Sequence, residues 1–208
     1  MTLISSSCSQ LCEALTIFSM AHPERQQTAE EIHRFIRQTP DGFSRHCRRG
    51  HMTGSAWLVH PSGDRVLLTL HHKLQRWLQP GGHADGETDM LHVALREAEE
   101  ESGITHIVPL QTDIFDLDIH TIPARPLAGE EEHLHYDVRY LLQARNEKIH
   151  LSPESDDLRW WSAGEILGHR ELFDDSVLRM TRLWMKHPLR HPTPYEAGGG
   201  DSARCPQC

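Results

Sequence analysis

The sequence of 208 residues predicts a layered domain of the α/β or α+β class over residues 45–187. Three observations support this fold class. Strand-like segments lie on both sides of one central helical segment, glycine-rich turns separate the segments, and further helical segments follow late in the chain. Residues 1–44 are expected to form a helical N-terminal extension. Residues 188–208, which are rich in proline and glycine, are expected to form a disordered tail.

The first half of the chain predicts helices followed by a β-hairpin. Residues 9–38 have the pattern of one or two amphipathic helices. Their apolar stripe contains Ala29, Ile32, Phe35 and Ile36. Thr53–His60 and Arg65–Leu70 are strand-like, and the turn-forming sequence Pro61-Ser62-Gly63-Asp64 joins them. Residues 71–88 are expected to form a long polar loop.

A central helix and three strands are predicted in the second half. Thr88 or Asp89 can cap the helix, and Gly103 can end it. Apolar and polar residues alternate most clearly in His133–Ala144, as in a strand with two different faces. The remaining predicted elements are strands at Ile114–His120 and Leu158–Trp161 and helices at Ala163–Leu167 and Leu172–Lys186.

The composition of the chain excludes several classes of function. The formal net charge is −9 and no run of lysine and arginine occurs, which argues against binding to a nucleic-acid polymer. No apolar stretch is long enough to cross a membrane, and the N-terminus lacks the pattern of a cleavable signal. The five cysteines are too few for a disulfide scaffold, so we expect a cytoplasmic protein.

The central helix carries three glutamates on one side. At about 100° per residue, Glu97, Glu100 and Glu101 fall within an arc of roughly 100°. A separate apolar stripe is formed by Leu91, Ala94, Leu95 and Ala98. Two carboxylates about 6 Å apart repel by roughly 3 kcal/mol at an effective dielectric of about 20, and a bound divalent cation would reverse this term. A solvated acidic face is the alternative interpretation.

Arg96 and the turn before the helix favour a site for metal and phosphate. Arg96 lies one helical turn before Glu100 and can hold its carboxylate. Gly81 and Gly82 have no side chains, so their backbone can approach an ion or a phosphate closely.

Residues 82–104 resemble the Nudix box, whose pattern is G-x5-E-x7-R-E-U-x-E-E-x-G-U with U aliphatic. The segment from Arg96 to Ile104 matches this pattern with the correct spacing, with Ala98 taken as the small apolar residue. The strands before and after the box extend the resemblance more weakly over about 140 residues.

One element of the box is displaced. Counting from Gly82, Thr88 stands where the family has its first glutamate, and Glu87 lies one residue too early. In the family this glutamate mainly supports the loop and the helix. Asp85, Glu87 or Asp89 could take over that support, so the displacement concerns the support rather than the metal ligands.

The resemblance implies an α/β/α sandwich around a mixed sheet and an Mg²⁺- or Mn²⁺-dependent hydrolase. Such an enzyme cleaves a diphosphate linkage, typically between a nucleoside diphosphate and another group, by attack of water. The implied metal ligands are Glu97, Glu100, Glu101 and the carbonyl of Gly82, with Arg96 orienting the cluster. Glu100 is the first candidate for the general base. Glutamates in later loops are further candidates: Glu130, Glu131, Glu132 and Glu154.

Further side chains are candidates for contact with the phosphates of the substrate. Lys73, Arg76 and His83 lie close to the glycine turn, although Lys73 and Arg76 also suit solvent-exposed loop charges. The polar face of the strand His133–Ala144 can line the substrate cleft, where Arg139 would touch phosphate. A solvated polar face is the alternative.

Two other patterns have weaker links to metal binding. Asp116, Asp118 and His120 share one strand face and could form a second metal site. Cys205 and Cys208 form a single C-x-x-C pattern, which we interpret as part of the loose tail because zinc needs four ligands.

Two alternative functions remain open on the sequence. An enzyme similar to isopentenyl-diphosphate isomerase would need a cysteine in the cleft, and Cys47 is the nearest one. A catalytically silent, ligand-sensing Nudix domain would regulate a partner, but such domains usually lose carboxylates of the box. We expect a small phosphorylated substrate derived from a nucleotide, but the sequence does not identify it. The sequence also leaves open whether the protein forms a homodimer.

Overall fold

The computed structural model describes residues 6–72, 75–125, 129, 131–151 and 155–190. In these residues the strands are β1 (Gly50–Val59), β2 (Arg65–His71), β3 (Arg76–Leu78), β4 (Gly81–His83), β5 (Ile107–Pro109), β6 (Asp116–Ile122), β7 (His133–Ala144) and β8 (Ser155–Ser162). The α-helices are α1 (Ser6–Ala21), α2 (Gln26–Gln38), α3 (Met90–Ser102), α4 (Ala163–Gly168) and α5 (Asp175–Lys186). Short 3₁₀ turns are η1 (Pro23–Arg25), η3 (Arg170–Leu172) and η4 (Pro188–Arg190).

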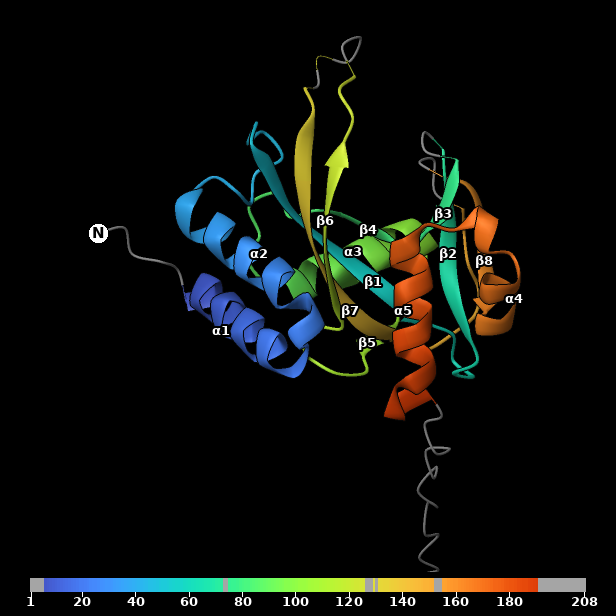
Figure 1. Cartoon of the computed structure of the whole chain (residues 1–208). Helices are drawn as coiled ribbons and strands as arrows, with labels where there is room; N and C mark the ends of the chain where they lie inside the picture. Colours follow the sequence, from blue (N-terminus) through green and yellow to red (C-terminus); the bar gives the residue numbers. More distant parts are fainter. Residues whose placement is uncertain (1–5, 73–74, 126–128, 130, 152–154, 191–208) are drawn as a thin grey trace, which may run out of the picture.

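The strands form one mixed sheet around a parallel central pair, β1 and β7. The two strands pair along their length, from Gly50 opposite Leu134 to Val59 opposite Gln143. The other edge of β1 pairs with β4 and then with β2, whereas the other edge of β7 pairs with β6 and then with β5. On each side of the central pair, two strands thus pair with different parts of the same edge, and the sheet branches there (Figure 1).

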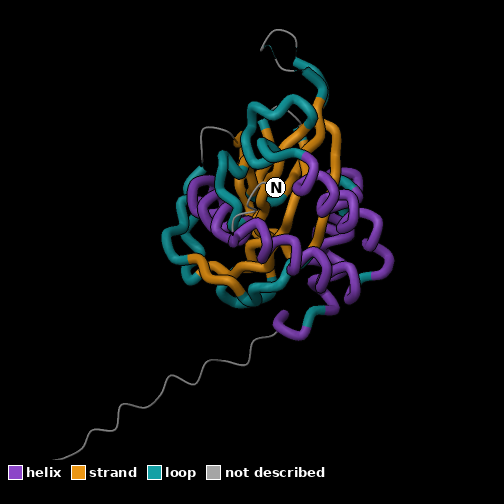
Figure 2. The backbone as a smooth tube through the Cα atoms, turned by 90° about the vertical axis from the view of Figure 1, so that its left-hand side faces the viewer, coloured by secondary structure: helices purple, strands orange, loops and turns teal. Residues whose placement is uncertain are grey.

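Helices cover both faces of this sheet (Figures 1 and 2). On one face, apolar side chains of β1 and β7 pack with α1, α2 and α3 in a single hydrophobic cluster. On the other face, a second cluster joins the sheet to α4 and α5 around Trp57 and Trp184, both fully buried. The predicted α/β/α sandwich around a mixed sheet is confirmed.

The N-terminal helices share the core of the domain. The predicted stripe is buried as expected: Ala29, Ile32, Phe35 and Ile36. Phe35 stacks on Tyr136 of β7 with ring centroids 3.9 Å apart. Arg25 donates a hydrogen bond to the carbonyl of Leu117 in β6. The segment predicted as an extension thus forms part of the layer that covers the sheet.

The expected long loop at residues 71–88 was wrong in part. It contains β3 and β4, and β4 pairs antiparallel with Thr53–Ser55 of β1. Three-residue strands are too short to show an alternating pattern, and two glycines in succession indicate a turn more than a strand. The short strand β5 escaped prediction for the same reason. The predicted hairpin turn is confirmed, since His60 donates its backbone N–H to the carbonyl of Arg65.

A network of charged side chains is buried where β6, β7 and α5 meet. Arg139 of β7 is only 2% exposed and contacts Asp137 at 2.7 Å, Asp116 at 3.1 Å and Asp118 at 3.2 Å. Arg179 of α5 contacts Asp116 at 2.8 Å and Asp118 at 2.9 Å. Arg25 adds a longer pairing, so three arginines balance three aspartates.

This network corrects two predictions. Arg139 is not a phosphate contact, because its guanidinium is buried and engaged by carboxylates. Asp116 and Asp118 do not form a second metal site with His120, because arginines supply the positive charge at those carboxylates. Burial by itself would raise the pKa of Asp118, but a hydrogen bond from His120 and the charges of Arg139 and Arg179 hold it well below its ordinary value.

No helix in the described part of the chain is both long enough and apolar enough to cross a membrane.

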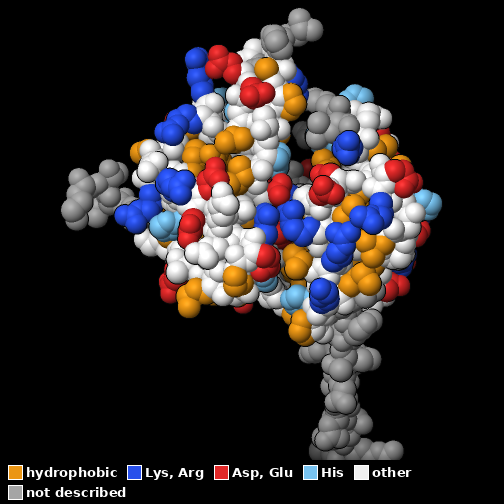
Figure 3. All heavy atoms as spheres, viewed as in Figure 1, with side chains coloured by type: hydrophobic (Ala, Val, Ile, Leu, Met, Phe, Trp, Pro, Cys, Tyr) orange, Lys and Arg blue, Asp and Glu red, His pale blue; other side chains and the backbone are white. Residues whose placement is uncertain are grey.

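On the face of the molecule that Figure 3 shows, basic and acidic side chains are interspersed.

Replacing Arg139 by methionine is expected to lower the free energy of unfolding by about 3–5 kcal/mol, because Asp116 and Asp137 would stay buried with too little positive charge. The control is Arg159→Met, which removes a half-exposed ion pair with Glu165 and the contact of the guanidinium with the Trp161 ring, and should cost no more than about 1–2 kcal/mol. Urea unfolding of the two variants measures the difference. Equal losses would contradict the structural role of the network.

Candidate active site

Helix α3 is fixed at both ends by local interactions. The Asp89 carboxylate caps its N-terminus by accepting the backbone N–H groups of Leu91 and His92, each at 3.1 Å. At the other end Gly103 has a φ of +70° and donates its N–H to the carbonyl of Glu99. The predicted N-cap at Asp89 and the end of the helix at Gly103 are therefore confirmed. Because both ends of the helix are fixed, the positions of the glutamates along it are fixed as well.

The loop before α3 is held by carboxylates other than the glutamate that the Nudix box has at the position of Thr88. Glu87 accepts the backbone N–H groups of Thr88 at 2.6 Å and of Asp89 at 2.8 Å. Asp85 pairs with Arg45 from the segment between α2 and β1. Together with the Asp89 cap, these contacts account for a stable loop with Thr88 at the expected glutamate position.

Glu97 lies directly against β4. A Cβ atom built on Gly82 would lie 2.6 Å from Cδ of Glu97, which is closer than real contacts allow. Gly82 therefore leaves the space that the Glu97 carboxylate occupies. The side chain of Glu97 is only 14% exposed, and this burial raises its pKa, although Arg96 acts in the opposite direction.

Arg96 joins the helix to β4. Its Nη2 donates to Oε1 of Glu97 at 2.7 Å and to the backbone carbonyl of His83 at 2.6 Å. Its Nε lies 4.0 Å from the carboxylate of Glu100, at the outer limit of an ion pair. The sequence predicted that Arg96 would hold Glu100, whereas its short contact is with the neighbouring Glu97.

The three glutamates differ in their environments. Glu100 is 63% exposed, Glu101 is half-buried, and Glu97 is nearly enclosed. Glu99 is exposed, as expected for a surface residue. The arc thus runs from an enclosed carboxylate at β4 to a solvent-accessible one, an arrangement with oxygen ligands that suits a hard divalent cation.

The predicted substrate contacts fall in different places. Arg76 is exposed on β3, and Lys73 lies outside the described residues. His83 lies on β4, where its carbonyl accepts from Arg96 and its ring faces other histidines. Among the later glutamates, Glu131 and Glu132 are exposed, whereas Glu130 and Glu154 lie outside the described residues, as does the C-x-x-C tail.

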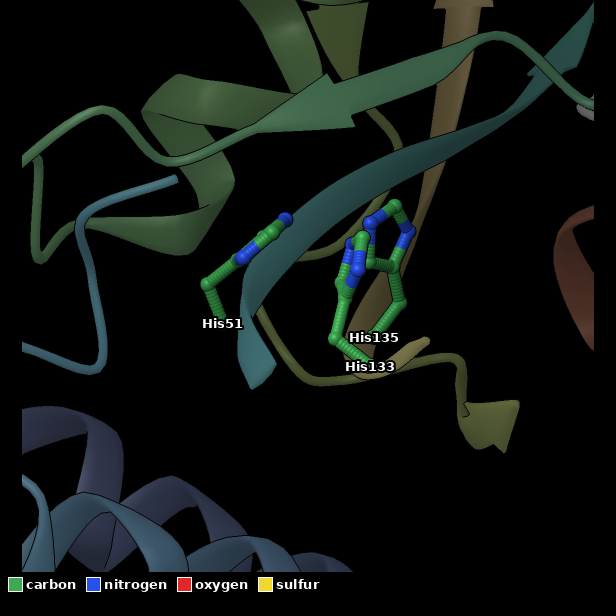
Figure 4. Close-up of side chains that lie close together, drawn as sticks. All are labelled: His51, His133 and His135. Carbon is green, nitrogen blue, oxygen red and sulfur yellow. The ribbon is translucent and has the colours of Figure 1, made fainter. Parts of the chain in front are cut away.

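A group of histidines on the polar face of the sheet was missed by sequence reasoning. His51 of β1 pairs in register with His135 of β7, which in turn is opposite His120 of β6. Figure 4 shows the rings of His51, His133 and His135 close together. No local signal could have found His51, since parallel pairing brings together residues that are far apart in the sequence.

Cys47 lies in the segment before β1 and is 5% exposed. A buried thiol outside the β4–α3 junction gives no support to isomerase chemistry, which would need an accessible cysteine in the cleft.

Comparison with known proteins gives one family. The family model described as NUDIX domain matches residues 50–182 of this chain. A curated relative from Lactococcus lactis subsp. cremoris (strain MG1363), named "Probable DHNTP pyrophosphohydrolase", is 28% identical over 89 residues. That match covers 43% of this chain and 52% of the relative, so the chain spans about half the length of the curated relative it matches.

Two solved structures are similar to this chain, and the first of them shares its fold. A crystal structure of a C. elegans Ap4A hydrolase binary complex matches with a TM-score of 0.51 and 18% identity, covering 64% of this chain and 94% of that one. The structure of MutT protein from Methanosarcina mazei Go1 matches with a TM-score of 0.49 and 21% identity, covering 64% and 91% of the two chains.

Replacing Gly82 by alanine is expected to leave the fold intact but to displace the Glu97 carboxylate, because the end of a flexible side chain can move away from the new Cβ. Misplacing this carboxylate should weaken Mn²⁺ binding by at least about tenfold. Gly164→Ala is the control, since a Cβ there would meet nothing within 4 Å. Electron paramagnetic resonance of free Mn²⁺ measures the affinities, and unchanged binding by Gly82→Ala would contradict the assigned role.

Proposed function

Because this chain belongs to the Nudix family, we propose that it is a metal-dependent pyrophosphohydrolase. Its substrate is a small, nucleotide-derived molecule with a diphosphate linkage, which it cleaves by attack of water on phosphorus. The observation that carries this proposal is the packing of Glu97 and Arg96 of α3 against Gly82 and His83 of β4.

The residues at this junction fit a divalent cation. Glu97 is a carboxylate whose burial is unfavourable for its charge, and it can occupy its position against β4 only because residue 82 is glycine. Glu97, Glu100, Glu101 and the carbonyl of Gly82 would hold Mg²⁺ or Mn²⁺, and all four are oxygen donors. When bound, such an ion neutralises charge on the phosphates and lowers the pKa of water.

The side chains of the chain itself have separate tasks. Arg96 positions the Glu97 carboxylate and ties it to β4 through the carbonyl of His83. Glu100 is exposed to solvent, so it can accept a proton from the attacking water and is our general base. Arg96 gives Glu100 only a distant pairing at 4.0 Å, so the orientation of Glu100 depends mainly on the helix.

The named relatives support the class of reaction. One is called a pyrophosphohydrolase and another an Ap4A hydrolase, and both names describe hydrolysis. For this chain the nucleotide-derived substrate is part of the proposal, as is a cytoplasmic location. There the thiols of Cys8, Cys12 and Cys47, which form no disulfide in the described residues, would remain reduced.

A screen of nucleotide sugars, ADP-ribose, dinucleoside polyphosphates, CoA and nucleoside triphosphates tests the activity. We expect turnover of at least one substrate with Mg²⁺ or Mn²⁺ and none in EDTA. Turnover that persists in EDTA would rule out the metal-dependent mechanism. Tight binding of a nucleotide without turnover would instead indicate a ligand-sensing domain.

Glu100→Gln is expected to lower kcat by about 10²-fold or more, because the amide cannot accept the proton of water. Glu99→Gln is the matched control, since Glu99 is the adjacent, exposed glutamate outside the arc, and it should keep wild-type kcat. Steady-state kinetics on the best substrate of the screen compares the variants. Full activity of Glu100→Gln would contradict its assignment as the base.

A further inference from the structure

The histidines on the polar face of the sheet form a compact group that the proposed hydrolysis does not use. One ring nitrogen each of His51, His133 and His135 lies within 4.8 Å of the others. His83 of β4 and His120 of β6 flank the group, with ring centroids 5.2 Å and 5.3 Å from that of His135. Four adjacent strands, β4, β1, β7 and β6, therefore contribute histidines at one level of the sheet.

Ring nitrogens of this group are buried without the hydrogen bonds that a buried imidazole usually makes. His51 is 3% exposed, and neither of its ring nitrogens makes a hydrogen bond of normal geometry to the described part of the chain. Nε2 of His135 is also buried without such a bond. A buried polar atom left unpaired is costly, and a metal ion would accept the lone pair of one nitrogen from each ring.

The packing of the rings favours a cation over an anion. His51 is 3% exposed, and its ring centroid lies 4.7 Å from that of His135 and 4.9 Å from that of His133. An anion would require several of these neighbouring rings to carry positive charge at once, whereas a metal cation binds the neutral imidazole.

His133 has the hydrogen bond that metal-binding histidines usually have. Its Nδ1 lies 2.8 Å from the backbone carbonyl of Glu131, which can only accept, so Nδ1 carries the proton and Nε2 keeps its lone pair. His120 is held in a similar way by Asp118, 3.3 Å from its Nδ1. These contacts orient rings toward the group from two strands.

We infer that His51, His133 and His135 form a binding site for a transition-metal ion, with Zn²⁺ as the best-fitting occupant. Imidazole nitrogens suit zinc and its neighbours in the transition series, whereas the oxygen donors of the glutamate arc suit Mg²⁺ and Mn²⁺. Nitrogens bound to tetrahedral zinc at about 2.0–2.1 Å lie roughly 3.4 Å apart. The ring nitrogens, which lie within 4.8 Å of one another, therefore need to close by at most about 1.4 Å. The fourth position is left for water or for His83 or His120.

The site is adjacent to the glutamate arc but separate from it. His83 follows Gly82 directly on β4, and its carbonyl accepts the hydrogen bond from Arg96. An ion bound by the oxygen donors of the glutamate arc and an ion bound by imidazole nitrogens would thus lie on opposite sides of β4. The consequence that an experiment can measure is that Zn²⁺ binds at the histidines while Mg²⁺ is in excess.

The test uses the full-length protein with its affinity tag removed, since a histidine tag would itself bind zinc. Isothermal titration calorimetry with ZnCl₂ in excess Mg²⁺ should show one tight site per chain. His51→Asn and His133→Asn should each weaken that site by at least about 100-fold, while circular dichroism checks their folding. Glu97→Gln and His92→Asn are the controls, because they alter the glutamate arc and an exposed histidine, and both should bind zinc as the wild type does.

X-ray absorption of the zinc-loaded wild type provides a readout that does not depend on the variants. We expect nitrogen or oxygen neighbours at about 2.0–2.1 Å with imidazole scattering and no sulfur at about 2.3 Å. A site with sulfur neighbours would place the ion on cysteines and overturn the assignment. The absence of a tight zinc site, or full binding by folded His51→Asn and His133→Asn, would overturn it as well.

Discussion

The parallel pairing of β1 with β7 is the interaction on which the rest of the structure depends. On one face it builds an apolar surface on which α1, α2 and α3 pack, and α3 brings the glutamates to β4. On the other face the same register aligns polar side chains, since Thr53 and Ser55 of β1 both donate to Asp137 of β7. One strand pair therefore positions both the glutamate arc and the histidines.

Burial divides the polar residues around the sheet into regions with different chemistry. Near α5, three arginines balance three aspartates, so this region stabilises the fold and offers no net charge to a substrate. The arginines are Arg25, Arg139 and Arg179, and the aspartates are Asp116, Asp118 and Asp137. Toward the other end, Nδ1 and Nε2 of His51 and Nε2 of His135 make no hydrogen bond of normal geometry to the described part of the chain. At the β4–α3 junction Glu97 is enclosed and contacts Arg96 at 2.7 Å. Only the last two regions have unsatisfied requirements that a bound ion would meet.

The sequence predicted well what depends on local pattern. The cap at Asp89, the stop at Gly103 and the glutamate arc follow from helix periodicity, and the fold class follows from the order of strands and helices. It failed where distant strands decide the outcome. Arg139 on a polar strand face has the pattern of a substrate contact until the position of Asp116 and Arg179 is known. The sequence alone does not place His51 in a site, because only the pairing of β1 with β7 brings it beside other histidines.

The most direct test of the central claim is hydrolysis of a diphosphate substrate in ¹⁸O-labelled water, with mass spectrometry of the products in Mg²⁺ and in EDTA. Attack of water on phosphorus predicts one ¹⁸O atom in a phosphate group of one product, formed only with the metal. A rearranged substrate without ¹⁸O would indicate isomerase chemistry. That result, or label incorporation that is equally fast in EDTA, would contradict a metal-dependent pyrophosphohydrolase.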